Sequence, residues 1–176
     1  MSVIKQITDS IEGVAGVKLL DVDPGWATNR TVVTFVGEVE AVVEAAFLCV
    51  VKAAQLIDMR KHHGEHPRMG ATDVCPLIPV SGISMDETAS YARRLAERIA
   101  VEAGIPVYCY EYAAFRSERK KLAVCREGEY EGLKPRFGAP EQMPDFGGEK
   151  WTDRVALTGC TAVGARDFLI AINFNL

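Results

Sequence analysis

The sequence has no long apolar run, no closely paired cysteines and no excess of basic charge. Its longest apolar stretch, residues 41–56, is interrupted by Glu44 and Lys52 and is too short to cross a bilayer. No basic segment followed by an apolar one opens the chain, so no membrane role is expected. The five cysteines are odd in number and form no CxxC pair, which favours reduced thiols in a reducing compartment. We therefore expect a cytoplasmic protein.

The charge balance argues against nucleic acid as a partner. Twenty Lys and Arg residues stand against 24 Asp and Glu residues, for a formal net charge of −4, and the basic residues are scattered. Phosphate binding needs a concentrated basic face. With 48% hydrophobic and 25% charged residues over 176 positions, the chain is long enough to bury a core. We expect one domain, residues 1–176, and a charged small molecule is the ligand class left open.

Hydrophobic periodicity predicts helices and strands that alternate after an initial hairpin. Ser84 and Glu87 form a capping-box pattern ahead of one helix, which Gly104 ends. Two prolines restrict the strand at residues 74–80 to a sheet edge or a bulge. This order predicts an α/β sandwich with helices on one face of a mixed sheet. Further predicted helices cover residues 2–12, 39–57 and 116–130, further strands residues 17–22, 31–36, 106–110 and 168–174, and an irregular excursion residues 132–159.

The polar stretch at residues 23–30, between the first two strands, is long for a hairpin connection and favours a ligand loop. Asp23 at its entrance is a candidate functional carboxylate. A side chain that caps a turn by accepting bonds from backbone amides is an equally good reading of Asp23. Arg30 and Arg68 carry the forked guanidinium that clamps a carboxylate, although either could be a solvated surface charge.

All three histidines, His62, His63 and His66, lie within five positions, together with Glu65. The spacing of His62 and His66 would suit a zinc site on one helix face. A glycine and a proline inside this stretch oppose a helix there, and the HExxH order is missing. A metal site is therefore the weaker hypothesis.

The other hypothesis is a single loop histidine that acts as general acid and base, because imidazole titrates near working pH. His66 is the better candidate, since Pro67 and Gly70 can hold its turn rigid. His62 and His63 fit better as positive charge near the end of a helix.

The string Gly-Glu-His-Pro-Arg-Met-Gly at residues 64–70 is the most specific motif in the chain. It is followed by Asp-Val-Cys-Pro at residues 73–76 and Ile-Pro-Val at residues 78–80. With these motifs the chain resembles the formiminotransferase family, specifically its N-terminal subdomain. Further matching strings lie at residues 20–23, 28–32, 34–37, 56–59, 128–131, 144–147 and 161–166.

The resemblance implies transfer of the formimino group from N-formimino-L-glutamate to tetrahydrofolate, a step of histidine degradation, with folate as the acceptor and no metal. The family's catalytic histidine falls on His66, and its folate-contacting loop falls on residues 147–159. One histidine can take a proton from the attacking nitrogen and return it to the departing one. On this basis we expect substrate or folate contacts from seven residues: Asp23, Asn29, Arg30, Glu65, Arg68, Gly147 and Gly159.

The resemblance also implies a ferredoxin-like fold and a second, C-terminal subdomain that we expect to be absent from this chain. Family members start with a strand that precedes the first helix, whereas this chain starts at that helix. Because that strand is central in the sheet, its loss would leave a gap, which a strand of this chain or of a partner copy is expected to fill. We therefore expect a homo-oligomer or a C-terminal subdomain partner. A non-catalytic module that binds folate or a partner is the alternative function.

Overall fold

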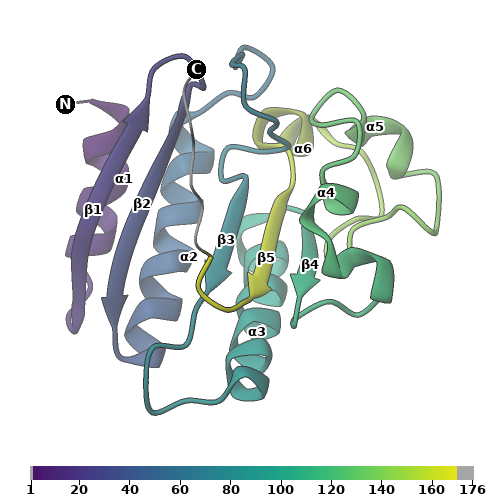
Figure 1. Ribbon diagram of the computed structural model, residues 1–176. Helices are drawn as coiled ribbons and strands as arrows, with labels where there is room; N and C mark the ends of the chain where they lie inside the picture. The colour runs from purple at the N-terminus through teal and green to yellow at the C-terminus, as the bar shows by residue number, and fades with distance from the viewer. Residues whose placement is uncertain (1, 170–176) are drawn as a thin grey trace, which may run out of the picture.

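Helices and strands alternate along the chain, and the predicted mixed α/β class is confirmed (Figure 1). The structure is a computed structural model that describes residues 2–169. The first elements are α1 (Val3–Glu12), β1 (Val17–Gly25), β2 (Arg30–Gly37), α2 (Val39–Leu56), β3 (Val74–Leu77), α3 (Met85–Ala103) and β4 (Val107–Glu111). They are followed by the 3-10 helix η1 (Ser117–Lys120), α4 (Leu122–Cys125), α5 (Leu133–Arg136), α6 (Asp153–Thr158) and β5 (Thr161–Ala165).

The strands of the described residues form two sheets, where the sequence predicts one. β1 and β2 pair antiparallel as a hairpin, and β3, β5 and β4 form a parallel sheet with β5 in the centre. β2 and β3 follow one another across the view of Figure 1. Residues of both strands line a groove. The ferredoxin-like arrangement implied by the resemblance stays a prediction.

The parallel sheet has a hydrophobic core on each face. Side chains alternate along its strands, so Val107, Cys109 and Val163 pack in the core beneath the long helices α2 and α3. Tyr108 and Ala162 point the other way, into a second core that residues of α4, α5 and α6 complete. The two long helices cover one face of the sheet, and the largely irregular segment after β4 covers the other (Figure 1).

The capping box of α3 confirms a prediction made from two residues. The Ser84 side chain accepts from the Glu87 backbone N–H, and the Glu87 carboxylate accepts from the Ser84 N–H at 2.9 Å. Gly104 ends the helix in the left-handed conformation, with a φ of 65°. One face of α3 is buried, as shown by Ala92, Leu95, Ala96 and Ile99.

The hairpin corrects the prediction of a long polar loop. β1 continues to Gly25 and β2 begins at Arg30, so the connecting turn is short. Asp23 lies opposite Val32, inside the strand pairing. Ladder pairing outweighs the turn preference of this stretch, and Pro24 is tolerated because β1 is an edge strand.

The charge-rich segment at residues 116–130 is not the surface helix that its composition predicts. It contains η1, the single turn of α4, and connecting turns. Arg119 is only 3% exposed, and its guanidinium donates to Asp145 and to the carbonyl of Met143, each at 2.6 Å. A buried guanidinium needs hydrogen-bond partners. The segment packs against the sheet because these partners are available there.

The strand that ends the described part of the chain, β5, also differs from the prediction. β5 was not predicted as a strand, because its small residues are buried throughout and show no alternation. Of the predicted strand at residues 168–174, Phe168 and Leu169 lie outside any strand, and the remainder lies outside the described residues.

Candidate functional site

The loop that follows α2, residues 57–70, is called the histidine loop here, and it is held against the turn of the β1–β2 hairpin. The Asn29 side-chain amide donates to the carbonyl of His63 at 2.6 Å. His62 Nε2 lies 2.9 Å from the carbonyl of Asn29 and donates to it, since a carbonyl oxygen only accepts. Asn29 itself has a positive φ of 47°, a conformation that asparagine tolerates better than most residues. Asn29 therefore connects the hairpin turn to the histidine loop through both its side chain and its backbone carbonyl.

Gly64 lets the two backbones approach closely at this contact. A Cβ atom at residue 64 would lie 2.3 Å from the carbonyl oxygen of Thr28, which is far inside contact distance. Next to it, the Glu65 N–H donates to the carbonyl of Ala27 at 3.3 Å. The absence of a side chain at residue 64 is thus a condition for docking the histidine loop.

His66 is held at both of its ring nitrogens. Nδ1 lies 2.6 Å from the carbonyl of Pro67, and Nε2 lies 2.6 Å from Nη1 of Arg30. Because a carbonyl only accepts and a guanidinium only donates, these partners require a neutral ring with its hydrogen on Nδ1. The lone pair on Nε2, which a general base needs, is covered by Arg30.

Arg68 binds carboxylates of this chain. Its guanidinium contacts Glu131 at 2.7 Å and Glu129 at 3.2 Å, and it stacks over the ring of Tyr130. The arginine side chain is 11% exposed. The hydrogen bond from Arg68 lowers the pKa of Glu131 to about 2. Arg68 therefore anchors residues 129–131 to the histidine loop.

Arg126 is neutralised in the same region by Asp73, with which it forms an ion pair. The other carboxylate oxygen of Asp73 accepts from the Met69 N–H at 2.9 Å and so fixes the end of the histidine loop. Arg30, by contrast, has no ion-pair partner within residues 2–169. At this end of the groove, Arg30 is a cation that can still take up an anionic ligand.

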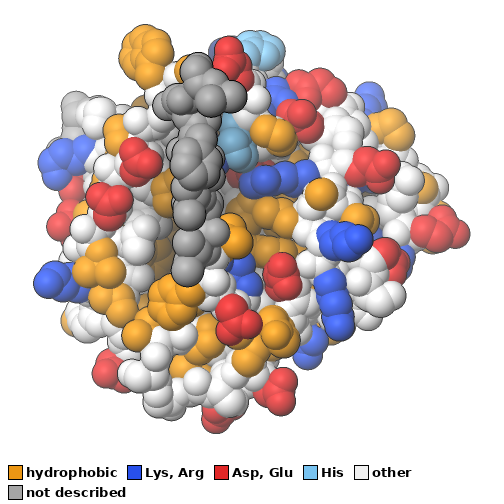
Figure 2. Space-filling view, viewed as in Figure 1, with side chains coloured by type: hydrophobic (Ala, Val, Ile, Leu, Met, Phe, Trp, Pro, Cys, Tyr) orange, Lys and Arg blue, Asp and Glu red, His pale blue; other side chains and the backbone are white. Residues whose placement is uncertain are grey.

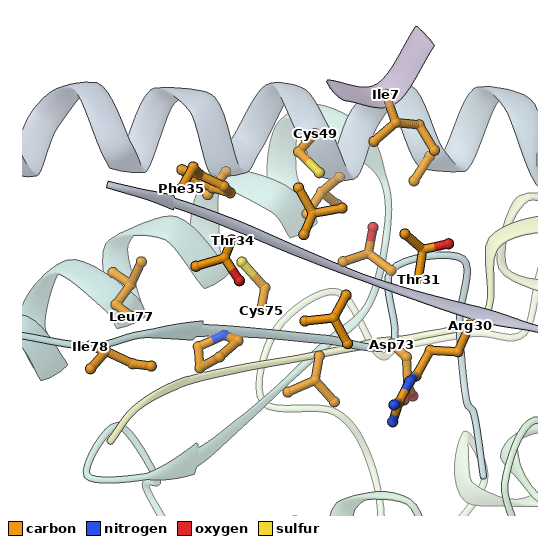
Figure 3. Close-up of a pocket in the computed structure, with 18 of the residues that line it drawn as sticks. Ile7, Arg30, Thr31, Thr34, Phe35, Cys49, Asp73, Cys75, Leu77 and Ile78 are labelled. Atoms are coloured by element: carbon orange, nitrogen blue, oxygen red, sulfur yellow. The ribbon is translucent and has the colours of Figure 1, made fainter. Parts of the chain in front are cut away.

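The groove between the two sheets has a volume of about 2110 Å³. Figure 3 shows Arg30 and Asp73 at one end of it and Phe35 and Leu77 toward the other. Figure 2 shows apolar side chains in the hollow of this face and basic side chains along one rim. The groove thus has a polar end beside the histidine loop and an apolar remainder.

The structure brings several of the predicted site residues to this polar end. Asn29, Arg30, His66 and Arg68 all line the groove. Asp23 lies nearby on the exposed face of the hairpin, opposite Val32, which is exposed on the same face. Residues that lie opposite each other in an antiparallel pair are on the same face of the sheet. Asp23, Val32 and Arg30 therefore share one exposed face of the hairpin.

The other predicted binding residues do not line the groove. The Glu65 side chain is exposed, and its backbone takes part in loop docking. Gly147 has a φ of 71° and packs close to Ala100 of α3. Gly159 ends α6 at the foot of the histidine loop, where a Cβ atom would lie 2.1 Å from the Met69 carbonyl. Each of these two positions thus favours glycine for a structural reason rather than for ligand binding.

Three partners of the predicted residues were missed by sequence reasoning. Asp73, Glu129 and Glu131 each hold the histidine loop or an arginine of the groove. Their motifs carry the family resemblance, but nothing in a single sequence shows that residues some 60 positions apart form ion pairs.

The helix-face geometry needed for the zinc hypothesis is not present, because α2 ends at Leu56, before the histidines. Within residues 2–169 no cluster of three or more His, Cys, Asp or Glu side chains could hold a metal ion. Over the same range, no helix combines the length and apolarity needed to span a membrane.

The close approach at residue 64 predicts that Gly64→Ala will lower the free energy of unfolding by about 1–3 kcal/mol, because two backbones must separate. Urea denaturation measures this. Gly138→Ala is the matched control, since its Cβ would meet only the Pro135 carbonyl at 3.7 Å, and it should change stability by less than about 1 kcal/mol. Equal stability of the Gly64→Ala variant and the wild type would show that the loop is not docked as described.

The lowered pKa of Glu131 predicts a pH-dependent stability. A carboxyl whose pKa falls from 4.5 to about 2 on folding stabilises the protein above pH 4.5 and loses that contribution as pH falls toward 2. The stability difference between the wild type and Glu131→Gln should therefore be constant near neutrality and shrink across that window. Thermal melts from pH 2 to 7 measure it, with Glu149→Gln as the exposed-carboxylate control. A difference that is unchanged at pH 2 contradicts the assignment.

Comparison with known proteins places the chain in a family. The model of the formiminotransferase domain, N-terminal subdomain, matches residues 1–166. A formimidoyltransferase-cyclodeaminase of Rattus norvegicus is 52% identical over 174 residues, which is 99% of this chain and 32% of that protein. Glutamate formimidoyltransferases of Streptococcus pyogenes serotype M1 and Thermoplasma acidophilum are 44% and 43% identical over 175 residues, or 58% and 56% of their lengths.

The chain therefore spans about a third of the bifunctional relative and less than three fifths of the other two. Nearly all of this chain takes part in each of the three matches. The motif-based resemblance is confirmed, and the chain belongs to the formiminotransferase family, within its N-terminal subdomain.

Proposed function

We propose that this chain supplies the catalytic half of a glutamate formimidoyltransferase site, which moves the formimino group of N-formimino-L-glutamate to tetrahydrofolate. Two relatives that share more than two fifths of its residues carry the name glutamate formimidoyltransferase. The observation that carries the proposal is the geometry at His66, a neutral imidazole beside an arginine that has no ion-pair partner among the described residues.

The reaction needs one proton to move between two nitrogens. N5 of tetrahydrofolate attacks the amidine carbon and forms a new C–N bond. The proton on N5 passes to the glutamate nitrogen, the old C–N bond breaks, and glutamate leaves. His66 Nε2 accepts the first proton and donates it again, so the ring ends as it began.

Arg30 has two tasks in this proposal. In the free chain it covers the His66 lone pair at 2.6 Å. A substrate carboxylate is a stronger acceptor than neutral imidazole, so its arrival draws the guanidinium away. Substrate binding thereby uncovers the base, and Arg30 becomes the clamp for a carboxylate of formiminoglutamate.

Asp23 and Asn29 take supporting roles. The formimino group is an amidine and carries positive charge when protonated, so a carboxylate on the same face as Arg30 suits it; Asp23 is that carboxylate. The Asn29 side chain already bonds to His63, so it positions the histidine loop. The proposal does not rest on Glu65, Arg68, Gly147 or Gly159, which have other contacts in the structure.

The remainder of the site comes from a second subdomain. The chain covers a part of its relatives, and its exposed hairpin face leaves the reacting groups open to water on one side. A C-terminal subdomain, on a partner chain or joined to this one, would close the site and hold tetrahydrofolate against His66. Holding two substrates together contributes more to the rate than proton transfer does.

His66→Ala should lower formimino transfer by about 10²- to 10⁴-fold, since positioned proton transfer is worth that much. The assay follows glutamate release from formiminoglutamate with tetrahydrofolate, with and without a separately supplied C-terminal subdomain of a relative. The matched control is His63→Ala, whose side chain is exposed and which should retain full activity.

Retained turnover in His66→Ala would refute the role of His66. Binding of a reduced folate without turnover, in the presence of the second subdomain, would instead favour the non-catalytic module. Tetrahydrofolate fluorescence titration separates these two outcomes.

Arg30→Lys should raise the KM for formiminoglutamate by about 10- to 100-fold, because a lysine cannot form the two parallel hydrogen bonds of a guanidinium. The KM for tetrahydrofolate should change little. Lys18→Ala, at the far end of the same hairpin, is the control and should leave both constants unchanged. An unchanged KM for formiminoglutamate in Arg30→Lys would contradict the carboxylate clamp.

A further inference from the structure

Trp26, in the turn of the β1–β2 hairpin, is a large apolar side chain left in solvent. It is 98% exposed. Tryptophan is highly buried on average in folded proteins, so an indole this exposed is unusual. The other tryptophan of the chain, Trp151, packs edge-on against Phe137 with the ring centroids 5.3 Å apart. Both faces of the Trp26 indole are therefore free to bind a ligand.

The backbone that carries this indole is held in place. The Trp26 carbonyl accepts from the Asn29 N–H at 3.2 Å, and the neighbouring Ala27 carbonyl accepts from the Glu65 N–H of the histidine loop. Because almost all of the indole surface is exposed, packing does not select its rotamer. The turn is thus a fixed support on which the side chain can still rotate.

The hairpin pairing places Trp26 next to the reacting groups of the proposed site. Gly25 lies directly opposite Arg30, and Trp26 follows Gly25. Opposite Cα atoms are at most about 5.5 Å apart and consecutive ones about 3.8 Å, so the Cα atoms of Trp26 and Arg30 lie within about 9 Å. The Arg30 guanidinium is in turn 2.6 Å from His66 Nε2. The hairpin turn and the histidine loop stand side by side at one end of the molecule (Figure 1).

The nearest aromatic alternative is already occupied. The hairpin turn and the histidine loop contain no other Phe, Tyr or Trp. Tyr130 approaches the histidine loop from residues 129–131, but its ring lies under the Arg68 guanidinium and its hydroxyl donates to the Ala156 carbonyl. An aromatic surface for a ligand at His66 therefore has to come from Trp26.

The chemistry of the reaction selects the ligand of this indole, and this step rests on the proposed function. N5 of tetrahydrofolate has to come within hydrogen-bond reach of His66 Nε2, about 2.6–3.2 Å. N5 belongs to a pterin, whose pyrimidine ring is flat and has polar edges. Stacking on an indole covers a face of such a ring and leaves its edges free for hydrogen bonds. Formiminoglutamate has no ring to stack.

We infer that Trp26 is a folate-binding residue, whose indole rotates to cover the site and stacks on the pyrimidine ring of the pterin. The contact holds N5 against His66 and excludes water from one face of the pterin. Because the turn is already fixed, binding orders only two side-chain torsions of Trp26, which costs little conformational entropy.

Fluorine NMR of the full chain, labelled with 5-fluorotryptophan, tests the contact without requiring turnover. Two resonances are expected, from Trp26 and Trp151, and Trp26→Phe assigns them by removing one. Titration with 5-formyltetrahydrofolate, a stable reduced folate, should shift the Trp26 resonance in a saturable way and leave that of Trp151 in place. An unlabelled C-terminal subdomain of a relative can be added, because it contributes no fluorine signal.

Steady-state kinetics give a second readout. Trp26→Leu should raise the KM for tetrahydrofolate by about 5- to 150-fold, the equivalent of stacking one flat base on an aromatic side chain. The KM for formiminoglutamate should change by less than about twofold, because that substrate does not touch the indole. Tyr112→Leu removes another exposed aromatic, after β4, and should leave both constants unchanged. A rise confined to the KM for formiminoglutamate would overturn the inference.

Failure of this inference differs from failure of the proposed function. Turnover, with folate binding seen by calorimetry and an unmoved Trp26 resonance, would overturn the inference alone. Absence of both turnover and folate binding would overturn the proposed function and the inference with it. A Trp26 resonance that moves with the second subdomain alone, and no further with folate, would assign the indole to that interface and overturn the stacking.

Discussion

The contact between the hairpin turn and the histidine loop brings together Arg30 and His66, the two central residues of the proposed site. It combines a hydrogen bond from the Asn29 side chain to the His63 carbonyl with the close approach of Gly64 to the carbonyl of Thr28. Because Arg30 follows the turn directly, docking of the loop brings His66 to the guanidinium. A loop with a side chain at residue 64 could not come this close, so a glycine two residues before His66 helps to position the proposed base.

Charge at the polar end of the groove is distributed unequally. Arg68 and Arg126 are neutralised by carboxylates of this chain and serve to hold loops together. Arg30 is left with a neutral imidazole, which is a weaker partner than a carboxylate. In the proposed function, an anionic substrate displaces the imidazole from this guanidinium, and that displacement frees the nitrogen that the reaction needs.

The division into two sheets connects the fold to the site. The hairpin carries Asp23 and Arg30, and the parallel sheet anchors the far end of the histidine loop through the bridge between Gly70 and Gly159. The two halves meet through α2 and through the docked loop, with a groove between their strands.

The sequence by itself determined the elements whose cause is local: the capping box at Ser84, the end of α3 at Gly104, and the loop histidine singled out by Pro67. It also determined the family, through the string at residues 64–70. Only the tertiary structure decided that the hairpin extends to Gly25, that Arg119 is buried, and that Arg68 is occupied by Glu131 while Arg30 remains available. The physical reason is range: capping and turn preferences act over a few residues, whereas ladder pairing and ion pairs join residues whose proximity only the folded chain creates.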